Sequence, residues 1–337
     1  DQSAHRIWLP PLPPVIELSA LPGLSGADDA GATAPAADQG QLRAPIGIID
    51  RPYYQRQDEL IIDFTQHGGH MALCGGPQSG KSSALRTIVS ALALRHDPQT
   101  ARFYVIDLGG GQLASLERLP HVAGVAGREE GEKVRRIVDE VAGFIRRPER
   151  CATFLVIDGW HHIGTSNAEF EDIAEKVTEI VADGASAHVH VIIATSRWTT
   201  MRPAIRDLIA NRLELRLGEA LDSLIDRKLQ QKLPSAPGRG LTLTGENMLL
   251  ARTSNQDIAH ICRVHAEAQP VPQLKMLPAV LTPAALAAQG DVPAHEIAWG
   301  IGGRDLDTLT WNPSREPHLV AIGAQGCGKS TFLAQVM

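Results

Sequence analysis

The stretch from residue 75 to residue 82 constrains the fold of this chain more than any other feature. It matches the pattern G-x-x-x-x-G-K-[ST], in which glycines let successive backbone N–H groups converge on a phosphate. An apolar run precedes it (70–74) and apolar residues at helical spacing follow it (82–95), so the sequence predicts a strand, a phosphate-binding loop and a helix. The residues predicted to bind a nucleotide here are Gly75, Gly76, Pro77, Gln78, Ser79, Gly80, Lys81, Ser82 and Ser83.

Two side chains of this loop have predicted roles of their own. Lys81 is expected to reach the β and γ phosphates of ATP, and Ser82 is expected to ligate Mg²⁺. The partial positive charge at the N-terminus of the following helix also favours an anion. ATP and Mg²⁺ are therefore the predicted ligands.

The same pattern returns at residues 323–330, after the apolar run 318–322. Its lysine lies 329 − 81 = 248 residues after the first one, which is one domain length. The approach to the loop repeats as well, because Pro-Ile-Gly-Ile (45–48) resembles Ala-Trp-Gly-Ile (298–301). The sequence therefore predicts tandem domains, and the predicted nucleotide-binding residues of the second loop are Gly323, Gly328, Lys329 and Ser330.

A second apolar run, at residues 152–157, ends in an acid, Asp158. A strand buried on both faces would deliver this carboxylate to the carboxyl edge of a parallel sheet, where a phosphate-loop protein has its Mg²⁺-side acid. The alternative is an aspartate that caps the next element; the loop upstream favours the catalytic and metal-binding role. Thr195 follows another buried run and is interpreted as a sensor of nucleotide state, although a hydroxyl that only satisfies the strand end explains it equally well.

Between residues 46 and 266, strand-like and helical patterns alternate. The predicted fold class is therefore α/β, with a mainly parallel sheet and helices on both faces. The predicted strands are 102–107, 152–158, 189–194 and 212–217, and the predicted helices are 132–145, 169–183, 204–210 and 221–229.

The segments on either side of this region are predicted to be linkers. Residues 1–45 are proline-rich and then Ala/Gly/Asp-rich, and residues 267–295 are rich in proline and alanine. The first linker is either a flexible tether or a segment that Trp8 and Leu9 pin to a domain surface. Residues 296–337 are then the start of a second domain.

Composition and charge disfavour several classes of function. The net charge of −6 disfavours a sequence-independent DNA-binding surface, which needs clustered Lys and Arg. The four cysteines show no C-x-x-C spacing, which favours a reducing compartment and no zinc site. No apolar run of membrane-spanning length is present, so this portion is expected to be soluble. The pair His161-His162 is interpreted as exposed loop histidines, not as a metal site.

Several motifs together resemble one family. Residues 75–82, 103–111, 119–122 and 154–160 resemble the FtsK/SpoIIIE group of ATPases. More narrowly, the chain looks like EccC, the multi-ATPase motor of type VII (ESX) secretion systems. The segments that carry this narrower resemblance are Trp8–Leu12, Arg197-Trp198, Arg206–Leu208, Glu214–Gly218 and Pro237–Gly240.

This resemblance implies a P-loop NTPase of the RecA/FtsK-like type, here a middle ATPase domain, the second of three, with the start of the third. It further implies a motor at the cytoplasmic face of the bacterial inner membrane that self-associates into a ring, expected to be a hexamer. The implied partners are the other core-complex subunits of the secretion system and the secreted WXG100 (Esx) and PE/PPE proteins. DNA is not an expected partner.

The chain departs from the family pattern at Gly159, where such motors usually carry a Glu that activates the attacking water. We therefore expect ATP–Mg²⁺ binding with slow hydrolysis, unless Glu171 or Asp172 folds back to substitute. The stretch between Arg147 and Cys151 is also shorter than usual in EccC. Arg197, Arg206 and Arg239 are candidates for a trans-acting arginine finger, with structural salt bridges as the favoured alternative. Three functions remain open: an export motor module, a nucleotide-locked structural module and, third, a DNA translocase.

Overall fold

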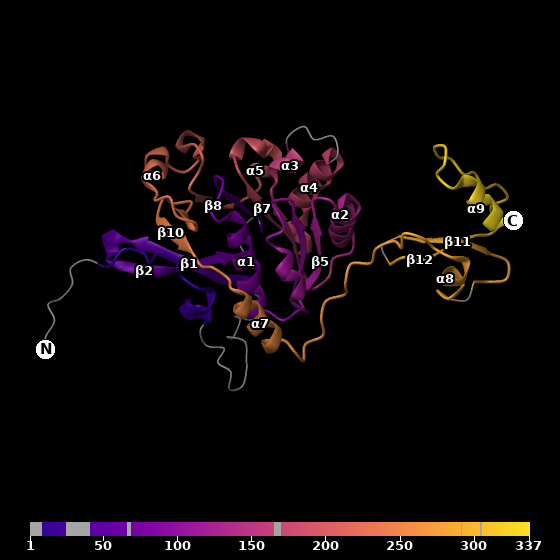
Figure 1. Ribbon diagram of the computed structural model, residues 1–337, viewed down its shortest axis with the longest axis horizontal. Coiled ribbons are helices and arrows are strands. Elements are labelled where there is room, and N and C mark those ends of the chain that lie inside the picture. Colours follow the sequence, from indigo (N-terminus) through magenta and orange to yellow (C-terminus); the bar gives the residue numbers. More distant parts are fainter. Residues whose placement is uncertain (1–8, 25–40, 66–68, 165–169, 291, 304) are drawn as a thin grey trace. The chain divides into compact units, whose positions relative to one another are not determined.

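The computed structural model describes residues 9–24, 41–65, 69–164, 170–290, 292–303 and 305–337 (Figure 1). The chain divides into two compact units, residues 1–273 and residues 274–337. Each unit is described by itself below.

Among the described residues of the first unit, ten strands form one sheet. They are β1 (Arg43–Arg51), β2 (Arg56–Asp63), β3 (Met71–Cys74), β4 (Ala101–Asp107), β5 (Val122–Gly127), β6 (Ala152–Asp158), β7 (Val189–Thr195), β8 (Asn211–Leu215), β9 (Arg239–Leu241) and β10 (Asn247–Leu250). Their order is β2-β1-β10-β9-β8-β3-β7-β6-β4-β5. The six strands from β8 to β5 pair in parallel, and the pairs from β2 to β8 are antiparallel.

Helices cover both faces of this sheet, so a buried apolar layer lies on each face. The α-helices of the first unit are α1 (Lys81–Arg95), α2 (Gly131–Arg146), α3 (His161–Gly164), α4 (Glu171–Asp183), α5 (Pro203–Arg206), α6 (Arg227–Lys232) and α7 (Asn255–Val264). Short 3₁₀ helices are η1 (Leu18–Ala20), η2 (Pro22–Leu24), η3 (Pro52–Tyr54), η4 (Ala114–Arg118), η5 (Gly184–Ala187), η6 (Trp198–Thr200) and η7 (Ala220–Asp222).

The central strands β4, β6 and β7 are buried at every residue, because both faces of the sheet are covered. Alternate residues such as Phe103 and Phe154 pack into one hydrophobic cluster with α1 and α7. Their neighbours point to the opposite face, where the ring of Tyr104 lies 6.2 Å from that of Phe144 in α2. The predicted α/β class, with a mainly parallel sheet, is confirmed.

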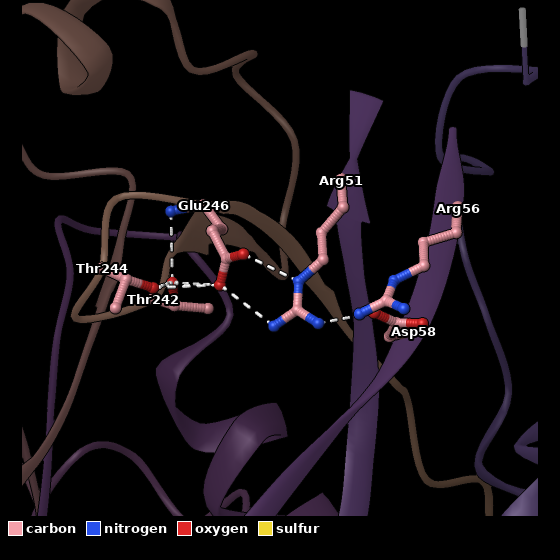
Figure 2. A network of polar contacts seen from close by, with 6 residues as sticks. All are labelled: Arg51, Arg56, Asp58, Thr242, Thr244 and Glu246. Atoms are coloured by element: carbon pink, nitrogen blue, oxygen red, sulfur yellow. Dashed lines mark hydrogen bonds and ion pairs between the residues drawn. The ribbon is translucent and has the colours of Figure 1, made fainter. Parts of the chain in front are cut away.

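The antiparallel strands were not part of the sequence prediction, and a polar network ties them together. Arg51 at the end of β1 donates to Glu246 Oε1 (2.7 Å) beside β10 and to Asp58 Oδ2 (2.6 Å) in β2 (Figure 2). The hydroxyl of Thr244 also donates to Glu246 (2.9 Å). These bonds raise the pKa of Arg51 and lower that of Glu246. The network fixes β10 beside the β1–β2 hairpin, which matters because the end of β10 reaches the functional site.

Two predicted helices are wrong in extent. The helix predicted at 204–210 is only α5, whose end is closed by Arg212 donating to the carbonyls of Arg206 and Ile209. The helix predicted at 221–229 separates into η7 and α6. Asp226 explains the separation, because its side chain accepts the N–H groups of Lys228 and Leu229 and so starts α6 as a new helix.

Part of the predicted first linker is packed on the first unit. Leu9 keeps 44% of its surface exposed, and Trp8 lies outside the described residues. The contacts come from later residues: Arg239 donates to the carbonyls of Leu12 (2.7 Å) and Pro13 (2.8 Å). The buried leucines of this segment are Leu12, Leu18, Leu21 and Leu24.

The second unit contains α8 (Pro283–Ala287), the antiparallel pair β11 (Ile297–Gly302) and β12 (Asp307–Trp311), and α9 (Lys329–Val336). The apolar run at residues 318–322 forms no strand: Val320 and Ile322 lie in irregular backbone with 76% and 93% of their surfaces exposed. In the first unit, β3 pairs with β7 and β8. The described residues of the second unit supply no such partners, and an unpaired strand is not stable in water. Among the described residues of both units, no helix is long and apolar enough to cross a membrane.

Candidate functional site

The predicted phosphate-binding loop joins β3 to α1, at the carboxyl edge of the parallel strands. Gly80 adopts a left-handed conformation (φ 98°), and a Cβ there would lie 2.9 Å from the backbone nitrogen of Gly238. A Cβ on Gly76 would lie 2.7 Å from the nitrogen of Gly218. Only glycine fits these two positions, because the loop backbone passes close to neighbouring backbone there. No side chain caps the first turn of α1, which leaves that end available to an anion.

The Lys81 ammonium lies across the loop. Its Nζ donates to the carbonyls of Gly75 (2.8 Å) and Gly76 (2.7 Å). Burial lowers the pKa of Lys81, while the negative charge of Asp158 opposes this shift. A partly buried ammonium held over a glycine-rich loop is placed to meet phosphate oxygens.

The predicted metal pair is brought together across 76 residues of sequence. Ser82 Oγ donates to Asp158 Oδ2 at 2.5 Å. Burial raises the pKa of Asp158, and the hydrogen bond from Ser82 acts against this rise. A Cβ on Gly109 would lie 2.5 Å from Asp158 Oδ2, so glycine leaves room beside the carboxylate. A carboxylate and a hydroxyl are hard oxygen donors, and this pair therefore fits Mg²⁺.

A cavity of about 640 Å³ surrounds these groups, a volume within the range of small-molecule sites. Sequence reasoning missed much of its lining. Pro14 and Val15 of the packed linker contribute to it, as does the segment Leu249–Arg252 at the end of β10. Nothing in these short apolar segments marks them as binding residues, because only the fold brings them to the loop.

Gly159 follows Asp158 in a left-handed conformation (φ 77°). A Cβ there would lie 3.1 Å from the carbonyl carbon of Leu108 and 3.2 Å from His162 Cδ2. A glutamate at this position would therefore require the surrounding backbone to move. The predicted substitutes, Glu171 and Asp172, begin α4 and are not among the residues that line the cavity; Asp172 pairs with Arg135 at 3.1 Å.

The two adjacent histidines differ from the prediction of exposed loop residues. His161 and His162 form the start of α3, are half-buried and line the cavity together with Lys81 and Asp158. Their ring centroids are 4.1 Å apart. Burial lowers the pKa of both imidazoles. Their position a few residues after a strand-ending acid is the signal that could have found them.

Thr195 ends β7, next to the loop. Its carbonyl accepts the N–H of Gly75 (3.1 Å), and its hydroxyl bonds to that of Thr200 (2.7 Å). The side chain is not among those lining the cavity. These contacts favour the structural interpretation of this threonine, and its sensor role remains a prediction.

The three candidate finger arginines all have partners within the chain. Arg197 lies 3.6 Å from Asp222, and Arg206 lies 3.4 Å from Asp207. Arg239 binds the packed linker, as described above. The candidate role in trans stays a prediction for all three.

The second loop repeats the local geometry of the first. Gly328 has φ 90°, and Lys329 Nζ donates to the carbonyls of Gly323 (2.8 Å) and Ala324 (2.5 Å). Ser330 follows within α9. Because the geometry recurs where residues 318–322 form no strand, the sequence of the loop itself fixes it.

Comparisons with known proteins identify the family of this chain. The family model described as FtsK/SpoIIIE matches residues 35–269. An ESX secretion system protein EccC of Thermomonospora curvata is 35% identical over 373 residues, and the alignment covers 98% of this chain and 28% of that protein. The ESX-4 protein EccC4 of Mycobacterium tuberculosis is 36% identical with the same two coverages. The chain thus spans less than a third of these relatives.

Two solved structures are also similar. The cytoplasmic domain of the T. curvata type VII secretion ATPase EccC is 34% identical with a TM-score of 0.82, over 98% of this chain and 43% of that one. EccC ATPases 2 and 3 from the same organism, in complex with a signal sequence peptide, are 33% identical with a TM-score of 0.81, over 98% of this chain and 66% of that one.

Proposed function

This chain belongs to the FtsK/SpoIIIE family and is similar to EccC, and we propose that its first unit binds ATP with Mg²⁺ and hydrolyses it slowly. The observation that carries the proposal is the short bond between Ser82 and Asp158 beside the Lys81 loop. These groups come from two parts of the chain, 76 residues apart, and meet in one cavity of suitable size.

In this proposal, different residues of the cavity contact different parts of the nucleotide. The loop backbone and Lys81 hold the phosphates, and Ser82 with Asp158 holds Mg²⁺. Leu249–Ala251 and the linker residues Pro14 and Val15 give an apolar wall suited to the base. Bound Mg²⁺ supplies positive charge to the phosphate oxygens.

Slow turnover follows from Gly159. No carboxylate follows Asp158, and the loss of a general base typically costs 10²–10⁴-fold in rate. The left-handed backbone at Gly159 and its close neighbours show why glycine suits this position.

We propose further that the unit is a module of a motor that exports proteins through a type VII secretion system. Several relatives carry ESX secretion names, and one similar structure holds a signal sequence peptide. The proposed cargo is the WXG100/Esx and PE/PPE class, and the proposed assembly is a membrane-associated ring, expected to be a hexamer, with other subunits of the secretion complex. The net charge of −6 disfavours the DNA-translocase alternative.

A nucleotide-locked structural module is the second candidate. The packing at Gly159 favours it, because a tightly held ATP that is not hydrolysed would simply stabilise the unit. At a thousand-fold excess over Kd, bound ligand contributes about 4 kcal/mol.

Calorimetry of ATP–Mg²⁺ binding, followed by an assay of phosphate release, tests the proposal. We expect binding by the native chain, loss of binding in Lys81→Ala, weak Mg²⁺-dependent binding in Asp158→Ala, and slow release. Lys228→Ala, an exposed lysine on α6, is the matched control and should bind as the native chain does. ATP binding without phosphate release favours the nucleotide-locked module over the slow ATPase. If the native chain does not bind ATP, or if Lys81→Ala binds it equally well, both candidate functions are contradicted.

A further inference from the structure

One side of the cavity is formed by a histidine that the proposed binding roles leave unused. α3 starts directly after β6, and two bonds fix that start: Trp160 N–H donates to Ala194 O (3.0 Å), and His162 N–H donates to Gly159 O (2.9 Å). Trp160 itself is fully buried. The backbone of His162 is therefore held firmly beside the end of β6 by the core.

The ring of His162 occupies the space next to the missing carboxylate. Its Cδ2 would lie 3.2 Å from a Cβ at residue 159, the position directly after Asp158. His162 also lines a neighbouring cavity of about 500 Å³, formed by Asp107–Gly111 and Gly127–Glu130. It thus lies between the cavity that holds Lys81 and Asp158 and a second space with room for water.

The surroundings keep this imidazole neutral. Burial and the charge of Arg128 lower the pKa of His162, and the ring of His161 packs against it. Lys81 and Asp158 face the same cavity. Glu129 and Glu130 line the second cavity, where Glu130 accepts the N–H of Gly127 at 2.8 Å. A neutral imidazole has one nitrogen that accepts a hydrogen bond, as a water-orienting side chain must.

We propose that His162 orients the attacking water in this unit and so carries its residual ATP hydrolysis. The proposal rests on the proposed ATP binding at the same site. The imidazole nitrogen accepts a hydrogen bond from a water molecule, whose oxygen forms a bond to the γ-phosphorus. The bond from that phosphorus to the β–γ bridging oxygen breaks, and its electron pair stays on ADP. The water proton leaves with the released phosphate, so His162 is unchanged at the end of the step.

The test compares His162→Leu, which removes the acceptor, with His162→Gln, which keeps one. Single-turnover hydrolysis, calorimetric ATP–Mg²⁺ binding and binding of ADP with aluminium fluoride are measured on the full chain. His260→Gln, on α7 away from the cavity, is the matched control.

We expect His162→Leu to slow single-turnover hydrolysis by about tenfold or more, to weaken ADP–aluminium fluoride binding and to leave ATP affinity within about twofold. His162→Gln should recover part of the rate, which a purely structural role would not explain. An unchanged rate in a folded His162→Leu chain that still binds ATP overturns the inference alone, and so does a rate in His162→Gln no higher than that in His162→Leu. The inference is also overturned if the native chain binds ATP but shows no measurable hydrolysis. Failure of the native chain to bind ATP overturns the proposed function itself.

Discussion

At the scale of single residues, glycine decides the chemistry of this site. Gly76 and Gly80 let the loop pass close to neighbouring backbone, and Gly109 leaves room beside Asp158. Gly159 is the most consequential of them for the proposed slow hydrolysis, because its left-handed conformation disfavours any side chain directly after Asp158. The backbone geometry at this position therefore favours glycine over glutamate.

We predict that Gly159→Glu does not restore fast hydrolysis and lowers the free energy of unfolding by about 1–3 kcal/mol. The physical reason is positive φ combined with backbone atoms of Leu108 and Gly109 at 3.1 and 3.2 Å from the new Cβ. Urea denaturation and single-turnover assays measure the two effects. Gly143→Ala is the matched control, since Gly143 lies within α2 with no atom near its Cβ position, and it should be stabilising. Fast turnover by Gly159→Glu would refute this account.

At the scale of elements, the packed linker is part of the site. The backbone at Ile16–Leu18 pairs with Arg252, through Leu18 N–H to Arg252 O (3.0 Å) and Arg252 N–H to Ile16 O (2.8 Å). Arg252 also pairs with Glu17 at 2.7 Å. The segment that holds the linker is thus the one that continues β10 into the cavity wall.

We predict that Arg239→Ala loosens this linker and weakens ATP binding, because it removes both bonds to the carbonyls of Leu12 and Pro13. Hydrogen exchange should become faster at the amides of Leu18 and Arg252. Arg227→Ala, which removes an exposed arginine from α6, is the control and should leave both amides as protected as before. Unchanged exchange in Arg239→Ala would mean that the buried leucines alone hold the segment.

At the scale of the whole molecule, several histidines are buried in the first unit. Burial lowers the pKa of His70, His121 and His190 to about 4. His70 Nδ1 accepts the N–H of Val191 (3.0 Å), a bond that a proton on that nitrogen would remove. His121 and His190 donate to the carbonyls of His96 (2.7 Å) and Gly69 (2.6 Å).

We predict that the first unit loses stability as the pH falls from about 6.5, the ordinary pKa of histidine, toward 4. In this window the unfolded chain binds protons that the folded chain excludes. By pH 4, each of these histidines therefore lowers the free energy of unfolding by on the order of 3 kcal/mol. Above pH 6.5 this stabilisation is fully present. Urea denaturation at a series of pH values measures it. Equal stability at pH 7 and pH 5 would contradict the prediction.

The sequence by itself determined the two phosphate-binding loops, the central strands β4, β6 and β7, and the pairing of Ser82 with Asp158. These follow from local patterns: glycine spacing, and apolar runs that end in an acid at the edge of a parallel sheet. The conformation of the second loop supports this, since Gly328 and Lys329 adopt the geometry of Gly80 and Lys81 without a preceding strand.

Only the tertiary structure decided the rest of the site. His162 and the linker residue Pro14 reach the cavity because α3 is anchored on β7 and the linker is held by Arg239. The antiparallel strands also depend on partners that are distant in the sequence. The physical reason is common to all of them: such contacts join residues far apart in the chain, and a local pattern carries no information about its distant partner.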